Sequence, residues 1–531
     1  MDRRTFLRSA VGAVATAGGL ATPAISQRAA AKALRLVPHA DLANFDPIWN
    51  GAYIARNAGV LVWDMLYGVD SALTPRRQMV EAEELSADGL TWTFRLRPGL
   101  KFHDGEPVLA SDAVASINRW AARDAMGRMI KAIENELVAV DDHTFRWALK
   151  KPYPKMLRAL GKMVTPSCFV MPARIAATDP FRQIGEYVGS GPMRFVRNEW
   201  VPGAKAVFEK FAGYAPRQEP PSWLAGGKNI LMDRIEWITV PDPATAAAAL
   251  QNAEIDWLEL VIPDLLPILR KNQSVVTAIT DPVGWVGTLV MNNLYPPFND
   301  VRARRAILMA LCQEDYMRAY VGNDDSLWKP IAGYFPPGTP LYTEEGGDIL
   351  KGPRKLDAAK RLLAESGYAG EPVTLMAAQD ILAFKAWGDL TVDLLKPLDM
   401  KVDLAAVDFG TVFARWLQKS PPRQGGWQML VMRGYGVMLG DPSGNMLTAD
   451  GNSWANGWAH NPQIEAEIAA WYNATSLDEE KTIAGRINRL AVEHVLYAPL
   501  GVHLAHYAWR KNVSGIVQAP LPLFWGVSKK A

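Results

Sequence analysis

Residues 92–105 read Trp92-Thr93-Phe94-Arg95-Leu96-Arg97-Pro98-Gly99-Leu100-Lys101-Phe102-His103-Asp104-Gly105. Apolar and polar residues alternate from position 90 to position 96, as they must on a half-buried strand. Residues 102–106 have the composition of a turn. Ser111 then offers an N-cap for a helix, and the helix has an apolar inner face at Val114, Ile117 and Ala121. The segment therefore predicts a strand, a turn and a helix in succession.

The same succession continues on both sides of this segment. Strand and helix patterns alternate along the chain, which predicts an α/β fold. A first strand is predicted at 33–37 and a helix at 52–66, and a second unit opens with a strand at 285–292. Residues 498–508 are apolar and read as extended, so we expect them to carry the chain back to the first unit.

Length and charge limit the classes of function. The chain has 531 residues, 21% charged and 49% hydrophobic, which is globular composition and too long for one small core. Its formal charge of +2 resides in the first 26 residues, so the remainder is close to neutral. A neutral body gives no electrostatic reason to expect a nucleic-acid partner. No later segment approaches a membrane-spanning run of apolar residues, so a soluble mature protein is expected.

The first 26 residues are typical of a signal peptide. Arg3-Arg4-Thr5-Phe6-Leu7-Arg8 is a basic segment, residues 10–21 are mildly apolar, and Pro23-Ala24-Ile25-Ser26 offers small residues for cleavage before Gln27. The arginine pair followed by Phe-Leu resembles a twin-arginine signal. Asp2 stands where that signal usually has Ser or Thr, so the general secretory route stays open, as does a basic amphipathic helix of the mature protein.

Cysteine content adds two expectations. Cys168 and Cys312 are the only cysteines, and neither follows the apolar segment of the signal, so no acceptor for a lipid anchor is present there. An oxidising compartment permits a disulfide between them, and the sequence leaves that pairing open. We expect a periplasmic protein without a lipid anchor.

Several segments, taken together, resemble the extracellular solute-binding proteins of family 5, the peptide-, nickel- and opine-binding components of ABC importers. The stretch at 92–105 is similar to the most recognisable segment of that family. The similar segments keep the family's order from about residue 34 to about residue 518. Besides residues 92–105 they are Ser111-Asp112-Ala113-Val114, Val188-Gly189-Ser190-Gly191-Pro192, Met291-Asn292-Asn293, Val301-Arg302-Ala303-Arg304-Arg305-Ala306, Asp357-Ala358-Ala359-Lys360-Arg361-Leu362-Leu363, Gly367-Tyr368 and Lys511-Asn512-Val513-Ser514-Gly515.

The resemblance implies a bilobed α/β periplasmic-binding-protein fold of the cluster C type, with an extra β-rich subdomain in the first lobe. Lobe I would span 33–275, with the β-rich subdomain at about 68–185, lobe II would span 276–490, and residues 491–531 would return to lobe I. The lobes would enclose the ligand and close by a hinge motion. The implied function is capture of a peptide-like or related small solute by a monomer, which delivers it to the permease subunits of an ABC importer.

The sequence offers no persuasive catalytic site. Gly189-Ser190-Gly191 is not a nucleophile elbow, because the serine comes one residue early and the strand follows the turn. His503 and His506 lie three apart in a predicted strand, so they point to opposite faces and cannot easily share a metal. A nucleotide-binding Gly-rich loop with a Lys-Ser/Thr end is absent. We expect no catalytic residue, metal or cofactor. An exported hydrolase and a receptor-adaptor for a membrane sensor stay open as alternatives.

Two loops carry candidate ligand contacts. Asn44, Phe45 and Asp46 follow the first predicted strand, and ligands of open α/β sheets gather beyond strand carboxyl ends. Trp454 and Trp458 lie in a Gly/Asn-rich loop where no helical or strand period would bury both rings, so they can stack on a ligand or anchor the loop.

The segment at 433–442 carries the remaining candidates. The resemblance places a pocket aromatic at Tyr435 and a second one at Phe409. Arg433 can grip a ligand carboxylate with its guanidinium, although an exposed arginine at a strand end is the commoner outcome.

Met438 stands where peptide-binding members of the family hold the ligand's α-ammonium with an Asp. A thioether cannot neutralise a buried cation. The resemblance therefore predicts that an ordinary peptide is not held by its N-terminus in the usual way, and that the ligand is an opine-like conjugate, a modified peptide or an oligosaccharide. Asp441 or Asp46 would be the substitute anchor if a standard peptide binds after all.

Export by the twin-arginine route has a direct test. We expect replacement of Arg3 and Arg4 together by Lys to trap a longer form in the cytoplasm, detected by fractionation and mass spectrometry. Normal export of this variant would contradict the route, although not the destination.

Overall fold

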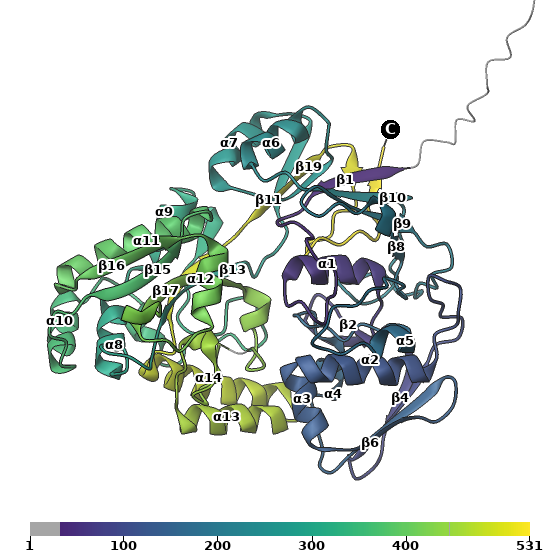
Figure 1. The fold of residues 1–531 in the computed structure, drawn as a ribbon, viewed down its shortest axis with the longest axis horizontal. Helices are drawn as coiled ribbons and strands as arrows, with labels where there is room; N and C mark the ends of the chain where they lie inside the picture. Colours follow the sequence, from purple (N-terminus) through teal and green to yellow (C-terminus); the bar gives the residue numbers. More distant parts are fainter. Residues whose placement is uncertain (1–31, 445, 531) are drawn as a thin grey trace, which may run out of the picture.

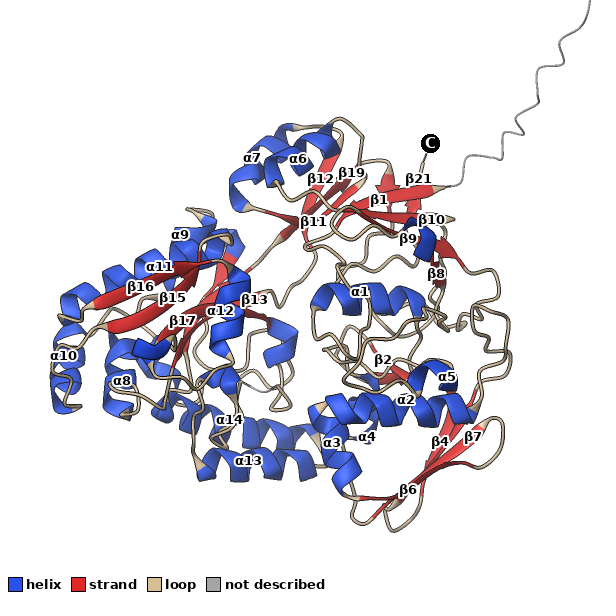
Figure 2. Cartoon of the chain, viewed as in Figure 1, coloured by secondary structure: helices blue, strands red, loops and turns tan. Residues whose placement is uncertain are grey.

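The computed structural model describes residues 32–444 and 446–530, so the predicted signal peptide lies outside the described residues. Two large sheets organise the chain, each flanked by helices (Figures 1 and 2). None of the helices in the described part is long and apolar enough to cross a membrane. The predicted bilobed α/β architecture is confirmed.

The first sheet has three parallel strands at its centre and antiparallel strands at both margins. We call this sheet, its helices and the inserted subdomain the first lobe. In spatial order its strands are β12 (Val275–Ile279), β19 (His506–Arg510), β11 (Trp257–Val261), β1 (Ala33–Val37), β10 (Arg234–Ile238), β9 (Lys205–Lys210) and β8 (Met193–Phe195). Its helices are α1 (Tyr53–Val62), α6 (Pro243–Gln251) and α7 (Leu266–Lys271).

The second sheet defines the second lobe, on the left of Figure 1. In spatial order its strands are β14 (Trp328–Lys329), β18 (Ala498–His503), β13 (Trp285–Met291), β17 (Met429–Tyr435), β15 (Val373–Ala378) and β16 (Val402–Val407). Its helices are α8 (Val301–Ala310), α9 (Gln313–Val321), α10 (Leu356–Glu365), α11 (Leu382–Leu395), α12 (Phe409–Trp416), α13 (Pro462–Asn473) and α14 (Leu477–His494).

A four-stranded antiparallel sheet forms the subdomain at the lower right of Figure 1. Trp92 and Phe94 point inward from β5, where Phe94 stacks on Phe145 with ring centroids 4.9 Å apart. The strands are β4 (Val80–Leu85), β5 (Thr91–Leu96), β7 (Thr144–Leu149) and β6 (Glu134–Ala139), and a hairpin of β2 (Tyr67–Val69) and β3 (Pro75–Arg77) precedes them. The helices are α2 (Ala110–Arg123), α3 (Ala125–Ala132), α4 (Met156–Gly161) and α5 (Ala173–Ala176). Two-stranded β20 (Val513–Ser514) and β21 (Ser528–Lys529) close the chain.

The predicted N-cap at Ser111 is wrong. The helix begins at Ala110 with Leu109 as its N-cap residue, two residues earlier than predicted, and the Asp112 carboxylate accepts the Leu109 amide at 2.8 Å in the capping role. Ser111 therefore lies inside the first turn of α2.

His103 joins the opening segment to the Gly189–Gly191 turn. Its backbone donates to the Gly189 carbonyl at 2.9 Å, and its Nδ1 accepts the Gly189 amide at 3.1 Å. The other ring nitrogen, Nε2, then donates to the Gly191 carbonyl at 3.0 Å. Burial lowers the pKa of His103 to about 4, so the ring is neutral and its role is structural rather than acid–base.

The changes of lobe fall several residues away from the predicted boundaries at 276 and 491. β12 pairs within the first sheet as far as Ile279, and β13 opens the second sheet at Trp285, so the first crossing is residues 280–284. β18 still belongs to the second sheet and β19 to the first, so the return crossing is residues 504 and 505. The return boundary differs because the segment at 498–508 is two strands of different sheets, which places His503 in the second lobe and His506 in the first.

Phe45 and Asp46, predicted as ligand contacts, are placed in the core of the first lobe. Phe45 lies among Trp63, Tyr187 and Phe195, with ring centroids 4.9–5.6 Å away. Asp46 is 0% exposed and forms a 2.7 Å ion pair with Arg119.

The rest of the Asp46 carboxylate is also occupied. It accepts three backbone amides, from Ile48, Trp49 and Ile184, each at 3.0 Å. The side chain is therefore satisfied inside the lobe. Asn44, half-buried, accepts a hydrogen bond from Asn50 within the same loop.

The structural role of Asp46 predicts a loss of stability rather than of affinity. Asp46→Ala leaves the Arg119 cation buried without its carboxylate, and we expect the free energy of unfolding to fall by about 3–5 kcal/mol. Chemical denaturation measures this, with the exposed Asp348→Ala as the matched control, expected within about 0.5 kcal/mol of wild type. A loss of less than about 1 kcal/mol in Asp46→Ala would contradict this role.

Candidate ligand-binding site

The two crossings between the lobes lie side by side. Ile279 pairs with His506 on the first-lobe side, and Trp285 pairs with His503 on the second-lobe side. Gly284 has a φ of +70°, and a Cβ there would lie 2.6 Å from the His503 carbonyl oxygen, so only glycine fits. The two crossings connect the sheets covalently at one place. Elsewhere the interface between the lobes consists of side-chain contacts.

The carboxyl ends of the central parallel strands of both sheets face this interface. β1 and β11 end there in the first lobe, and β15, β16 and β17 in the second. Ligands of open α/β sheets bind beyond such strand ends. The side chains that follow these strands are therefore the candidates for the site.

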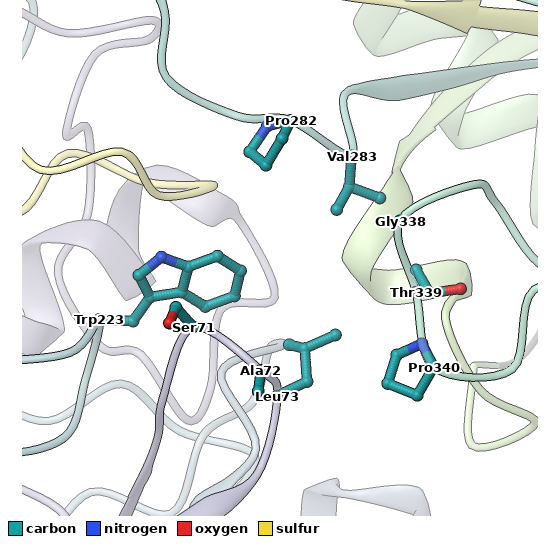
Figure 3. A pocket seen from close by; sticks show the side chains of 9 residues that line it. All are labelled: Ser71, Ala72, Leu73, Trp223, Pro282, Val283, Gly338, Thr339 and Pro340. Atoms are coloured by element: carbon teal, nitrogen blue, oxygen red, sulfur yellow. The ribbon is translucent and has the colours of Figure 1, made fainter.

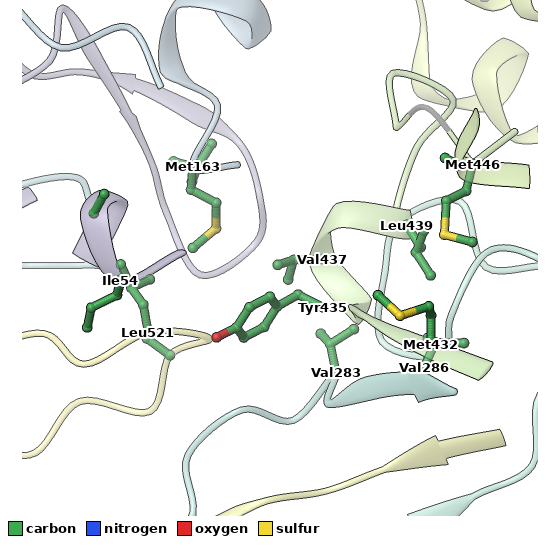
Figure 4. Close-up of a cluster of buried hydrophobic side chains, with 14 of the residues drawn as sticks. Ile54, Met163, Val283, Val286, Met432, Tyr435, Val437, Leu439, Met446 and Leu521 are labelled. Atoms are coloured by element: carbon green, nitrogen blue, oxygen red, sulfur yellow. The ribbon is translucent and has the colours of Figure 1, made fainter. Parts of the chain in front are cut away.

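Tyr53 and Tyr435 make the central contact between the lobes. Tyr53, the first residue of α1, meets the Tyr435 ring edge-on, with centroids 4.1 Å apart and an interplanar angle of 85°. Its hydroxyl donates to the Met438 sulfur at 2.8 Å. Burial raises the pKa of Tyr53 to about 12, so this hydroxyl keeps its proton at neutral pH. Figure 4 shows Tyr435 extending from the second lobe toward Ile54 and Leu521 of the first.

A polar network lies behind Tyr53 in the first lobe. The Arg56 Nη2 donates to Asn57 Oδ1 at 2.7 Å, and Asn57 Nδ2 donates to Glu259 at 3.0 Å. Glu259 also accepts the His39 amide at 2.8 Å and lies 2.9 Å from the His39 ring. The Arg56 guanidinium lies over the rings of Tyr53 and Tyr435, at 5.0 and 5.4 Å from their centroids.

Asp281, in the first crossing, is a buried carboxyl beside this network. Burial raises its pKa to about 6 despite amide hydrogen bonds and the nearby Arg56 charge. Its Oδ2 has no hydrogen-bond partner in the described part of the chain.

Aromatic residues extend the site into the second lobe. Trp285 lies against Tyr435 with ring centroids 3.6 Å apart, and the Arg433 guanidinium lies 4.5 Å from the Trp285 centroid. Phe384 flanks Arg433 at 5.7 Å, and the predicted Phe409 packs on Phe384 at 5.9 Å. The structure thus brings Tyr435, Met438 and Arg433 together at the interface, with Phe409 one ring further from it.

An apolar crevice of about 400 Å³ opens between the lobes beside this contact (Figure 3). Val283 connects the two places, because it lines the crevice and would touch a Cβ at Gly436, directly after Tyr435. Leu73 and Trp223 line the first-lobe wall with φ angles of +58° and +47°, which non-glycine residues rarely adopt. The second-lobe wall is the Gly338–Pro340 loop.

Trp454 and Trp458 lie elsewhere. Trp454 packs edge-on against Trp416 of α12 at 4.6 Å, and Trp458 packs on Trp427 at 5.7 Å. From Trp427 to Tyr435 the chain rises ~3.3 Å per residue, about 26 Å in all, so Trp458 lies at the opposite end of β17 from the lobe interface. Both rings anchor their loop in the second lobe.

A second contact between the lobes is ionic. Lys155, the N-cap residue of α4, forms a 2.6 Å ion pair with Glu480 of α14, and both side chains are largely buried. Arg158 reaches Glu480 at 3.2 Å and Asp441 at 3.5 Å, and Trp471 Nε1 donates to Glu480 at 3.2 Å. We call these five residues the clasp; Figure 1 shows α13 and α14 running to α3 and α4 at this place.

Sequence reasoning missed Tyr53, Arg56, Glu259, Asp281 and Trp285. Arg56 and Asn57 interrupt the apolar pattern of the predicted helix at 52–66, and both are 0% exposed. A charged residue inside a helix that is otherwise apolar on nearly every side was the available signal. Glu259 is likewise a charged residue within an otherwise apolar strand, which was the available signal there.

Comparison with known proteins decides the family. The family described as bacterial extracellular solute-binding proteins, family 5 middle, matches residues 74–457. The chain belongs to this family. It is therefore a substrate-binding transport protein of the periplasmic-binding type.

Individual relatives of this family 5 protein cover nearly its whole length. "Probable peptide ABC transporter periplasmic-binding protein y4tO" of Sinorhizobium fredii is 33% identical over 495 residues, 92% of each chain. Glutathione-binding protein GsiB of Pectobacterium atrosepticum is 27% identical over 491 residues, 89% of this chain and 88% of its own. The solved structure of the binding protein AgaA with agropinic acid, from A. tumefaciens R10, superposes with a TM-score of 0.77 at 20% identity, over 94% of this chain and 99% of that one.

The clasp predicts that closure weakens when one of its charges is removed. Lys155 and Glu480 lie on different lobes, and Glu480→Gln leaves Lys155 desolvated in the closed arrangement, a cost of about 3–5 kcal/mol that opening relieves. Small-angle scattering should therefore give a larger radius of gyration for Glu480→Gln than for wild type. Lys385→Met, which removes an exposed pair within α11, is the control and should change nothing. An unchanged radius in a folded Glu480→Gln protein would show that the clasp does not hold the lobes together.

Proposed function

We propose that this protein captures a peptide-like or related small solute between its lobes at the Tyr53–Tyr435 contact and delivers it to the permease of an ABC importer. One observation carries the proposal. The carboxyl ends of the strands of both sheets face the Tyr53–Tyr435 contact, and this contact lies next to the two crossings between the lobes. A rotation about those crossings opens the contact without breaking either sheet.

The chemistry of the interface favours some solutes over others. The names of the similar proteins include peptide, glutathione and agropinic acid as ligands of those proteins. Trp454 and Trp458, on which an oligosaccharide would have stacked, pack within the second lobe instead. A peptide-like solute or an opine-like conjugate is therefore the favoured ligand, and an oligosaccharide the less favoured alternative.

The carboxylates that could replace the missing Asp as the anchor of a free α-ammonium are paired with other residues of the described chain. Met438 already accepts the Tyr53 hydroxyl, and a cation, Arg56, lies over the Tyr435 ring. Of the two substitute anchors, Asp46 is paired with Arg119 in the core and Asp441 with Arg158 in the clasp. We propose that recognition does not depend on the ligand's N-terminus.

Catalysis is not part of the proposed function. Ser190, in the only turn that approached a nucleophile motif, is buried; its hydroxyl donates to the Val170 carbonyl at 2.9 Å and accepts the Asp64 amide at 3.0 Å. Within the described residues, no three His, Cys, Asp or Glu side chains gather as a metal site. A receptor-adaptor differs from a transporter in its partner, and neighbouring genes for permeases and ATPases would favour transport.

We further propose that the protein is exported as a monomer, cleaved after Ser26, and acts in the periplasm without a lipid anchor. Cys168 is buried and Cys312 partly buried, and both are free thiols in the structure.

A thermal-shift screen tests the proposed function. Peptides, opines, oligosaccharides and metal chelates are added singly, and a solute that binds the folded protein should raise the melting temperature by mass action. Calorimetry then compares a di- to pentapeptide library with its N-acetylated form, and we expect equal affinities. Micromolar binding that disappears on acetylation would show that an ammonium is recognised after all. Failure of every solute class to raise the melting temperature would leave the transport function without support.

A further inference from the structure

A column of four groups crosses the interface. It consists of the Arg56 guanidinium, the Tyr435 ring, the Trp285 ring and the Arg433 guanidinium. Successive separations are 5.4 Å, 3.6 Å and 4.5 Å, measured between ring centroids or from centroid to guanidinium carbon. Two aromatic rings are thus capped at both ends by a positive charge, and each guanidinium lies in cation–π contact with a ring.

Neither charge is neutralised by the protein. Within the described residues no carboxylate lies within 4.0 Å of Arg433 or Arg56, although the other buried arginine of the first lobe described above, Arg119, has one. Arg56 is 0% exposed and gives its hydrogen bonds to Asn57 Oδ1 and the Met163 carbonyl. A buried charge without a counter-ion is costly, so an anion at this place has much to gain.

Among the described residues, none of the acids near the column forms an ion pair with either guanidinium. Glu259 is satisfied by His39 and Asn57. Asp380, beyond the end of β15, accepts the Phe409 amide at 2.9 Å. Asp281 forms no ion pair within 4.0 Å with either guanidinium among the described residues; burial raises its pKa to about 6 and the Arg56 charge lowers it in part. The ring of His503, beside Trp285, stays neutral because burial and then the Arg433 charge hold its pKa well below the usual range.

Arg433 is also held in place for recognition. Trp285 and Phe384 flank its guanidinium at 4.5 and 5.7 Å, and no hydrogen bond to another described residue uses its N–H groups. Aromatic contacts restrict the side chain while leaving the fork of N–H donors unused. Two N–H groups of a guanidinium can donate to both oxygens of one carboxylate. A side chain that is already restricted loses less conformational entropy when it binds a ligand.

We propose that Arg433 receives a carboxylate of the ligand and that Arg56, at the other end of the column, makes the closed site selective for anionic solutes. The proposal rests on the proposed function, because it concerns the solute held between the lobes. Closure on a neutral or cationic solute leaves the two guanidinium groups unpaired, whereas closure on a carboxylate supplies the missing counter-ion. The favoured ligands are thus N-blocked peptides with a free carboxyl end and opine-like acids.

Matched acid and amide ligands test the proposal. The probes are N-acetyl-Met-Leu and N-acetyl-Met-Leu amide, with citrate and its triamide as a second pair, titrated calorimetrically at constant ionic strength. We expect at least one acid to bind wild type, and its amide to bind about 10- to 100-fold more weakly, the range of a charge-assisted hydrogen bond. Arg433→Gln should lose this preference and Arg433→Lys should keep part of it, because the lysine retains the charge without the fork.

Arg423→Gln is the matched control, because Arg423 is an exposed arginine of the same lobe with no ion pair to another described residue. It should keep the acid preference, and melting temperatures confirm that every variant folds. Equal binding of acid and amide by wild type, or an undiminished preference in Arg433→Gln, would overturn the proposal. If both pairs fail to bind while another solute class shifts the melting temperature, the carboxylate proposal is wrong and the transport function stands. If no solute of any class binds, both the carboxylate proposal and the proposed transport function fail.

Discussion

Two backbone crossings, running side by side, connect the lobes of this protein. Strand pairing continues to Ile279 and His506 on one side and begins again at Trp285 and His503 on the other. Sheet hydrogen bonds cannot slide by fractions of a residue, so in the closure that we propose each lobe would move as a unit and the rotation would fall on the residues between the paired strands. Trp285 and His503 border these crossings and also belong to the aromatic surface of the candidate site.

The closed arrangement balances two kinds of electrostatic contact. In the clasp, Lys155 and Arg158 of the first lobe meet Glu480 and Asp441 of the second, and both signs are present. At the Tyr53–Tyr435 contact the charges nearest the rings are Arg56 and Arg433, and they are alike in sign. On our proposals, the clasp would favour closure irrespective of the ligand, whereas the column would make closure depend on what lies between the lobes. A binding protein needs the second property, because a lobe pair that closes equally well on any solute has no selectivity.

Sequence patterns predicted the fold well and the site only in part. The alternation at residues 90–96 gave β5 because the side-chain period of a strand is visible locally. The family resemblance led to Tyr435 and Met438, and guanidinium chemistry led to Arg433; all three lie at the interface, and their contact with ligand stays a prediction. Asp46 could not be read correctly, since its partner Arg119 lies on another helix and no local pattern shows a distant ion pair. The same limit hid Tyr53 and Glu259, which acquire their place only when the two sheets meet. The absence of a period in their loop makes Trp454 and Trp458 candidate ligand contacts in the sequence, yet in the structure they pack against rings of α12 and of the segment before β17.

The central claim is that the lobes rotate about residues 280–284 and 504–505 and close on the ligand at Tyr53 and Tyr435. Pulsed electron-spin resonance measures this directly between labels at Phe181→Cys in the first lobe and Leu417→Cys in the second, both exposed positions, with Cys312 replaced by Ser. With a ligand identified by thermal shift, the account predicts a shorter mean distance and a narrower distribution than without ligand. Identical distance distributions in the two states would contradict it.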